Sequence, residues 1–264
     1  MKKVLEKDTI SCLRVSDFNT TGLIGVETTE QENNKFLALA KGTGVSEKPG
    51  QVAGGSKGVG KNAAFLMSSL RTVFYSTRTN QDTKGNPGVF SGSIGVSELV
   101  SGYIDDEIIE KRDYTQGTGY FSKDNFNSAI DEIYNLDPNF TKRNSQFGTD
   151  IYILGFVEND EWENDIINSI LDSFMVSIVR GELAIVFNGR EISKNTIKDL
   201  VYDDSIIYRG NRSNIVSQYR LLTDGDNVKI YDIETDYGAC TLHILPLSKE
   251  EEDLATHKCV MVRH

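Results

Sequence analysis

The chain has 264 residues, of which 38% are hydrophobic and 25% charged, a balance typical of a soluble globular protein with one large or two ordinary domains. The formal net charge of −11 disfavours a broad basic surface for nucleic acid. The N-terminal "MKKVLEKDTI" has basic residues but no apolar run after them, so it does not predict a signal peptide. No window approaches a membrane span, and Cys12, Cys240 and Cys259 form no CxxC pair. We therefore expect a cytoplasmic protein with reduced cysteines and no membrane contact.

The first expected element is a strand in "ISCLRVSD" at 10–17, because apolar residues alternate up to Asp17. A polar, glycine-dotted stretch follows from 19 to 55. It is long for a simple connection, which favours a lid or a disordered segment. Residues 61–70 then predict a helix, since they are apolar on nearly every side after Lys61.

Several further elements are expected before residue 157. Strands are predicted at 72–78, 89–96 and 147–156, a turn at 82–88, a polar irregular region at 102–123, and an amphipathic helix at 124–135. The segment "FGTDIYILGF" at 147–156 is the clearest buried strand of the chain.

The composition shifts after "VENDE", which predicts a domain boundary near residue 158. Apolar residues then recur at helical spacing from Trp162 to Ile178, and Gly181 is a natural helix stop. A hairpin at 183–192 with an Asn-Gly turn, a short helix at 194–201, and strands in "GACTLHILPL" and "KCVMVRH" complete a second α/β unit.

The glycine-rich stretch "GGSKGVGKNAAF" suggests phosphate binding in more than one way. Gly55, Gly60 and Lys61 fit the GxxxxGK pattern of a P-loop, whose backbone N–H groups hold phosphates. Asn62, however, replaces the magnesium-binding Ser or Thr, and no buried strand precedes the loop. A P-loop NTPase therefore remains the less favoured alternative. The dinucleotide fingerprint GxGxxG is excluded by spacing.

Three segments in order resemble the glycine boxes of the GHKL superfamily, which includes gyrase-type topoisomerases, MutL, large heat-shock chaperones, MORC proteins and histidine kinases. "DFNTTGL" at 17–23 resembles the first box, "GGSKGVGKNAAF" at 54–65 the second, and "FGTDIYI" at 147–153 the distal Gly-Thr box. The likeness is greatest to bacterial MORC-like and chaperone-like ATP-binding proteins. It covers about residues 8–157.

The resemblance implies an α+β fold with two domains. Residues 1–157 would form a Bergerat-type α/β sandwich with a mixed, mainly antiparallel sheet, and 158–264 a smaller transducer-like (ribosomal S5-like) α/β domain. The family's ExxxN helix is not found before Asp17, so we expect an N-terminally incomplete first domain and a C-terminally incomplete second one. Glu30 and Asn34 fit ExxxN but follow the first box, and we interpret them as a coincidence.

The resemblance also assigns roles at the base-binding end of the site. In GHKL pockets a buried carboxylate accepts a hydrogen bond from the adenine amino group, and Asp17 matches it. Such an acceptor rejects guanine, which presents a carbonyl there. Thr149 would support Asp17 and the base, and Gly22 would let the chain pass close to the base or ribose.

At the phosphate end, the glycines would expose backbone N–H groups and the following helix would direct its N-terminus at the phosphates. Lys61 would add a charge and Asn62 a donor, and Lys41 lies in the expected lid. The full predicted set for binding ATP with Mg²⁺ is Asp17, Asn19, Gly22, Lys41, Gly55, Ser56, Gly58, Val59, Gly60, Lys61, Asn62 and Thr149. Metal ligands and a catalytic residue are not assigned.

The implied function is ATP binding and, in a longer protein, ATP hydrolysis coupled to lid closure and homodimerisation of a clamp acting on DNA or a protein client. A lysine of the second domain, Lys194, Lys198 or Lys229, would reach the γ-phosphate. This chain, without the expected catalytic Glu, should bind adenine nucleotides weakly and hardly hydrolyse them. The alternative is a nucleotide-sensing interaction module that does not hydrolyse ATP.

Overall fold

A computed structural model describes residues 2–41, 62–98, 117–124, 128–131, 133, 136–138, 140, 143, 145–208, 212–236 and 238–246. The predicted glycine loop at 54–61 and the strand predicted in "KCVMVRH" lie outside these residues, as does most of the polar region 102–123.

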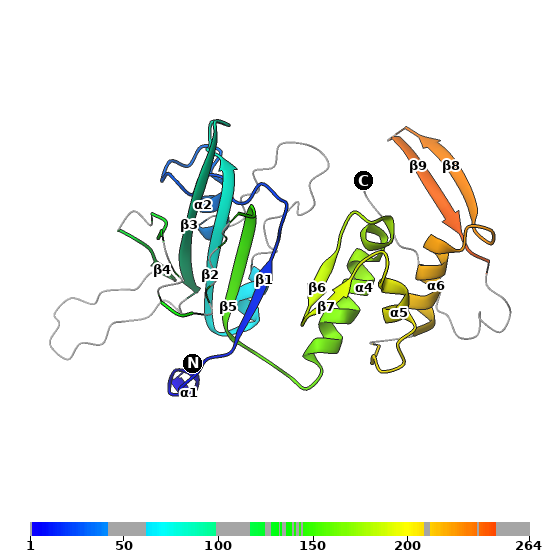
Figure 1. Ribbon diagram of the computed structural model, residues 1–264, viewed down its shortest axis with the longest axis horizontal. Coiled ribbons are helices and arrows are strands. Elements are labelled where there is room, and N and C mark those ends of the chain that lie inside the picture. The colour runs from blue at the N-terminus through cyan, green and yellow to red at the C-terminus, as the bar shows by residue number, and fades with distance from the viewer. Residues whose placement is uncertain are drawn as a thin grey trace. The chain divides into compact units, whose positions relative to one another are not determined.

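The chain divides into two compact units, Met1–Val157 (unit 1) and Glu158–His264 (unit 2). Unit 1 contains α1 (Lys2–Leu5), β1 (Cys12–Ser16), α2 (Lys35–Lys41), α3 (Asn62–Leu66), β2 (Ser68–Gln81), β3 (Pro87–Glu98), β4 (Thr118–Phe121) and β5 (Gly148–Phe156) (Figure 1). Unit 2 contains α4 (Trp162–Arg180), β6 (Ile185–Phe187), β7 (Arg190–Ile192), α5 (Ile197–Val201), α6 (Arg212–Thr223), β8 (Lys229–Thr235) and β9 (Gly238–Ile244).

The five strands of unit 1 form one sheet in the order β1-β5-β2-β3-β4. β5 therefore lies between β1 and β2, and its Ile151 is opposite Val15 on one side and Tyr75 on the other. Every pairing in this sheet is antiparallel. The predicted mainly antiparallel sheet is confirmed, whereas its expected parallel component is not found among the described strands.

One face of the sheet is covered by two short helices. Val73 and Ile94, which are fully buried, pack against Phe36 of α2 and Phe65 of α3. Because side chains alternate across a strand, odd-numbered residues of β2 and β5 point to this face. We call it the helical face.

The opposite face carries a smaller aromatic cluster. Phe74 and Tyr152 pack there with Ile133 and the half-buried Phe140. The rings of Phe140 and Tyr152 meet edge to face, with centroids 4.8 Å apart. Even-numbered residues of β2 and β5 therefore point to this face, which we call the aromatic face.

Unit 2 is held together by apolar residues of its first three helices and of the β6–β7 hairpin. The helix α4 ends where Gly181 adopts φ +80° and its N–H caps Ile178, which confirms the predicted stop. Between β6 and β7, Asn188 and Gly189 both have positive φ, as the predicted type I′ turn requires. Gly189 has nothing near its missing side chain, so φ alone favours glycine there.

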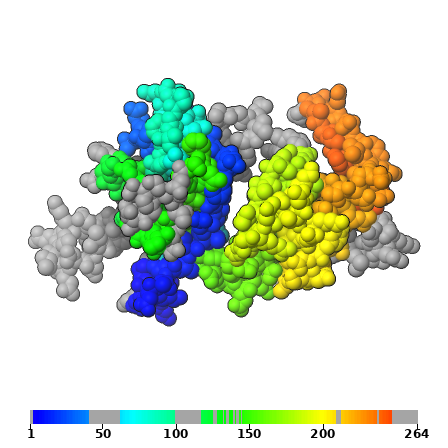
Figure 2. Space-filling view, in the orientation of Figure 1, coloured from blue at the N-terminus to red at the C-terminus, as the bar shows by residue number. Residues whose placement is uncertain are grey.

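The β8–β9 hairpin, also in unit 2, is exposed along both strands. Its atoms lie at the surface of the space-filling view, in orange (Figure 2). Tyr231 lies opposite Leu242, and Ile233 opposite Cys240, so apolar side chains gather on one side of this two-stranded sheet.

The helix predicted over 61–70 is too long. α3 ends at Leu66, and Ser68 already begins β2. The Ser68 hydroxyl contacts the Leu154 carbonyl at 2.5 Å, and the Ser69 hydroxyl donates to the Gly155 carbonyl at 2.8 Å. These serines satisfy groups at an irregular join between β2 and β5, which apolar periodicity does not reveal.

The predicted amphipathic helix at 124–135 is wrong for the described residues of that segment. Ile130 instead pairs with Ser93 of β3 through two backbone hydrogen bonds of 2.7 and 2.8 Å. Ile130 and Ile133 pack in the aromatic cluster, whereas Ala129 packs against the cluster on the helical face. A pattern of apolar residues over a segment this short is compatible with a helix and with an extended chain.

Among the described residues, three helices were not expected from the sequence: α1 near the N-terminus, α2 within the polar stretch 19–55, and α6 in unit 2. Among the described residues, none of the helices combines the length and apolar character needed to cross a membrane.

Candidate functional site

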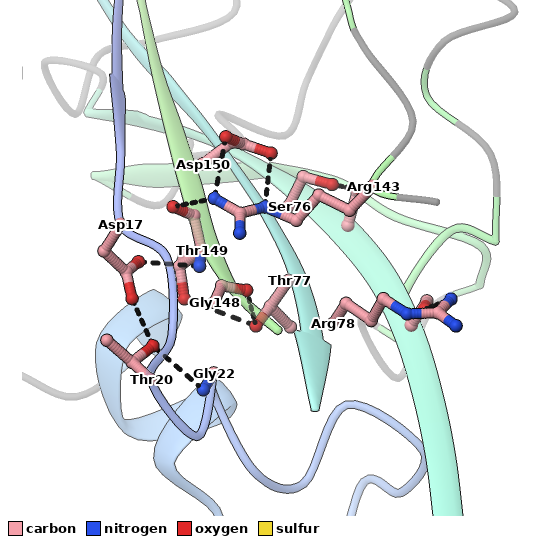
Figure 3. A network of polar contacts seen from close by, with 12 residues as sticks. Asp17, Thr20, Gly22, Ser76, Thr77, Arg78, Arg143, Gly148, Thr149 and Asp150 are labelled. Atoms are coloured by element: carbon pink, nitrogen blue, oxygen red, sulfur yellow. Dashed lines mark hydrogen bonds and ion pairs between the residues drawn. The ribbon is translucent and has the colours of Figure 1, made fainter. Parts of the chain in front are cut away.

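The end of β1, the start of β5 and the end of β2 meet at one corner of the sheet (Figure 3). Asp17, directly after β1, donates its N–H to the Thr149 carbonyl at 3.0 Å. The Thr149 N–H returns a bond of 2.6 Å to the Asp17 Oδ1. The two residues are thereby joined by their backbones and by the carboxylate, although they are far apart in sequence.

The second carboxylate oxygen of Asp17 accepts a hydrogen bond from the Thr20 hydroxyl. Thr20 Oγ1 in turn accepts the Gly22 N–H at 3.3 Å. Asp17 is exposed, so the expectation of a buried carboxylate is wrong for this structure. The reason is its position, because it follows the last residue of β1, which is at the edge of the sheet formed by the described strands.

Gly22 lies directly against β2. Its φ is +66°, and a Cβ would stand 2.4 Å from the Arg78 carbonyl oxygen and 2.9 Å from Thr77 Oγ1. Both features demand glycine. The close approach brings the loop after Asp17 under the end of β2.

Two buried hydroxyls complete the corner on the helical face. Thr77 Oγ1 accepts the Leu23 N–H at 2.8 Å and donates to the Gly148 carbonyl at 3.1 Å. It also contacts the Thr149 hydroxyl at 3.3 Å. Thr77 and Thr149 thus tie the loop, β2 and β5 together next to Asp17.

Arg143 supports the same corner from the aromatic face. Its Nε and Nη2 donate to the two Asp150 oxygens at 2.7 and 2.9 Å, and both side chains are almost completely buried. Nη2 also donates to the Thr149 carbonyl at 2.7 Å. The guanidinium carbon lies 4.7 Å from the centre of the Phe18 ring, a cation–π contact.

The structure therefore brings Asp17, Gly22 and Thr149 together, as the resemblance implies for a base-binding corner. Asn19 is exposed with φ +60°, and Asn62 is exposed at the first position of α3. Lys41 is the last residue of α2, and its side chain is not described. Outside the described residues lie Gly55, Ser56, Gly58, Val59, Gly60 and Lys61.

Asn34, half of the coincidental ExxxN match, is fully engaged with backbone. Its two Nδ2 hydrogens are shared among the carbonyls of Gly25, Thr28 and Glu30, and its Oδ1 accepts the Leu37 N–H at 2.8 Å. This last bond caps α2. The residue is 1% exposed.

Four supporting residues were missed from the sequence, namely Thr20, Thr77, Arg143 and Asp150. The sequence indicated two of them weakly. Thr77 fits the alternation of its strand, and Asp150 comes directly after Thr149, a predicted site residue. Arg143 had no such indication, because it lies in a polar stretch and reaches Asp150 only through the fold.

Among the described residues, no group of three or more His, Cys, Asp or Glu side chains could hold a metal ion. The expected Mg²⁺ site therefore has no support there. Comparisons add no assignment, since no family model, no curated protein and no solved structure matches the chain.

Proposed function

We propose that the corner formed by Asp17, Gly22 and Thr149 binds an adenine nucleotide, within a Bergerat-type arrangement of unit 1. One observation carries this proposal: the Asp17 carboxylate is held by the Thr149 N–H and the Thr20 hydroxyl, yet it remains exposed. It is an oriented acceptor that a ligand can reach.

The Asp17 carboxylate, an acceptor, fits the amino group on the adenine edge. Each carboxylate oxygen can accept about two hydrogen bonds, and each Asp17 oxygen is given one here, which leaves capacity for the adenine amino group. Guanine would present a carbonyl oxygen to the same carboxylate. The guanine carbonyl oxygen and the Asp17 carboxylate would repel each other and form no hydrogen bond, which would weaken GTP binding.

Phosphate binding by residues 55–61 belongs to the same proposal and rests on the sequence pattern. The described residues do not provide a magnesium site, and we derive no step through a metal. Hydrolysis and nucleotide-dependent dimerisation, which the resemblance implies, are likewise proposed for a longer protein.

Calorimetric titration with ATP, GTP and a nonhydrolysable ATP analogue tests the proposal. We expect binding of ATP and of the analogue, and affinity for GTP at least about tenfold lower. Asp17→Asn should weaken ATP binding on the order of 10- to 100-fold, the usual value of a hydrogen bond to a charged group. Asp8→Asn, which makes the same charge change at an exposed position before β1, should bind as the unmodified protein does.

Equal affinities for ATP and GTP, or an Asp17→Asn variant that binds ATP normally, would contradict adenine recognition by Asp17. Sedimentation of the same samples with and without the analogue shows whether this chain dimerises on nucleotide binding. A P-loop NTPase, by contrast, would keep its ATP affinity in Asp17→Asn.

A further inference from the structure

The Arg143 side chain is charged and nevertheless buried. It is 7% exposed and lies beside Asp150, which is 4% exposed, at the aromatic face of the corner. Three of its hydrogen bonds go to β5, two to the Asp150 carboxylate and one to the Thr149 carbonyl. The guanidinium is therefore hydrogen-bonded to two consecutive residues of that strand.

Thr149 links Arg143 to Asp17. Its carbonyl accepts both the Arg143 Nη2 at 2.7 Å and the Asp17 N–H at 3.0 Å, while its N–H donates to the Asp17 carboxylate at 2.6 Å. A shift of the Thr149 backbone would therefore move the carboxylate. Figure 3 shows this chain of contacts from Asp150 through Arg143 and Thr149 to Asp17.

Arg143 also contacts the β1 side of the corner. Its guanidinium covers the ring of Phe18, the neighbour of Asp17. Gly148 makes this approach possible, because a Cβ there would stand 2.2 Å from the Asp17 carbonyl oxygen and 2.6 Å from Arg143 Nη1, and its φ is +140°. Arg143 thus spans the join between β1 and β5.

We propose that Arg143 is a positioning residue for adenine recognition: from the opposite face of the sheet it fixes Thr149, and Thr149 orients the Asp17 carboxylate toward the base. This inference rests on the proposed function. It adds a residue that does not touch the nucleotide and yet sets the preference for ATP over GTP.

A purely structural role gives a different expectation. A buried ion pair contributes little to stability compared with a well-packed apolar pair of similar size. Replacing both partners, in Arg143→Met/Asp150→Leu, should therefore preserve the fold while removing the bond to the Thr149 carbonyl. If Arg143 only stabilises unit 1, this double variant should bind nucleotide normally.

The experiment combines ATP and GTP titration with the amide NMR signal of Thr149 in the full chain. For Arg143→Met/Asp150→Leu we expect a cooperative thermal transition, ATP affinity lower by roughly tenfold, and a reduced preference for ATP over GTP. The Thr149 amide proton should move upfield even without nucleotide, because its charge-assisted bond to Asp17 lengthens.

The matched control is Lys123→Met/Asp131→Leu, which removes an exposed ion pair of unit 1 and should leave both readouts unchanged. If the double variant at Arg143 does not fold, Arg143→Lys decides, because lysine keeps the charge but lacks the planar guanidinium that bonds both Asp150 oxygens and the Thr149 carbonyl. A folded variant with unmodified ATP affinity and an unmoved Thr149 signal would overturn this inference alone. An unmodified protein that binds no adenine nucleotide would overturn the proposed function and this inference with it.

Discussion

Gly22 shows how one residue shapes the candidate site. The chain turns there with positive φ and presses against the Arg78 carbonyl, so a side chain would collide with backbone that cannot move independently. The same contact brings Thr20 and Asp17 to the end of β2. Glycine is therefore required at this point by packing, before any ligand is considered.

The variant Gly22→Ala should lose clearly more stability than Gly85→Ala, a matched control. Gly85 also has positive φ, at +83°, but nothing lies within 4 Å of its missing Cβ. The control should lose about 1 kcal/mol from backbone strain, and Gly22→Ala roughly 2 kcal/mol more from the collision. Urea unfolding of both variants measures the difference in the free energy of unfolding. Equal losses for the two variants would contradict the prediction, because they would show that the loop moves to accommodate the added Cβ without cost.

The buried Tyr75 hydroxyl should make the stability of the fold depend on pH at alkaline values. Burial, with a smaller contribution from Glu98, raises the pKa of this hydroxyl from 10.0 to about 12. Between pH 10 and 12 the unfolded chain releases this proton and the folded one retains it, so the free energy of unfolding falls as pH rises. This difference in pKa corresponds to a loss of about 2.7 kcal/mol, at most, from the free energy of unfolding.

In Tyr75→Phe this part of the alkaline decline should disappear. Stability at pH 7 should be unchanged or higher, because the buried Tyr75 hydroxyl has no hydrogen-bond partner among the described residues. Urea unfolding at pH 7, 10 and 11.5 provides the comparison. A decline as steep as in the unmodified protein would place the titrating group elsewhere.

At the scale of elements, α2 depends on a single buried amide. Asn34 caps the helix and also joins three carbonyls of the loop before it. Asn34→Ala should lower the free energy of unfolding by about 2–4 kcal/mol, since the cap is lost and the buried Leu37 N–H is left without its acceptor. Asn80→Ala, at an exposed position of β2, should change it by less than about 0.5 kcal/mol. Similar losses for both would rule out Asn34 as the organiser of this loop.

Some elements could be predicted because their signals are local. Alternation identified β1, and the apolar character of "FGTDIYILGF" identified β5 as a buried strand. Gly181 and the Asn188–Gly189 pair indicated a helix stop and a turn, because both depend on backbone conformation alone. The helix α2 could not be predicted, since its cap makes contacts that only the folded loop brings together. The helix predicted at 124–135 was wrong because Ile130 pairs with the backbone of Ser93 in β3, a long-range contact that apolar spacing does not indicate.

At the scale of the whole molecule, the candidate site depends on strand order. Placing β5 between β1 and β2 brings Asp17, Thr77 and Thr149 to one corner, although they lie in three distant segments. The ordered boxes predicted Asp17 and Thr149 together. Arg143 could not be predicted, because no local pattern indicates which buried carboxylate an arginine will meet.

The most direct measurement is a chemical double-mutant cycle on the adenine amino group. ATP and purine riboside triphosphate, which lacks that group, are titrated against the unmodified protein and against Asp17→Asn. We predict that the unmodified protein prefers ATP by at least about tenfold and that the Asp17→Asn variant loses most of this preference, because one hydrogen bond joins the two groups. The same preference in both proteins would contradict recognition of adenine by Asp17.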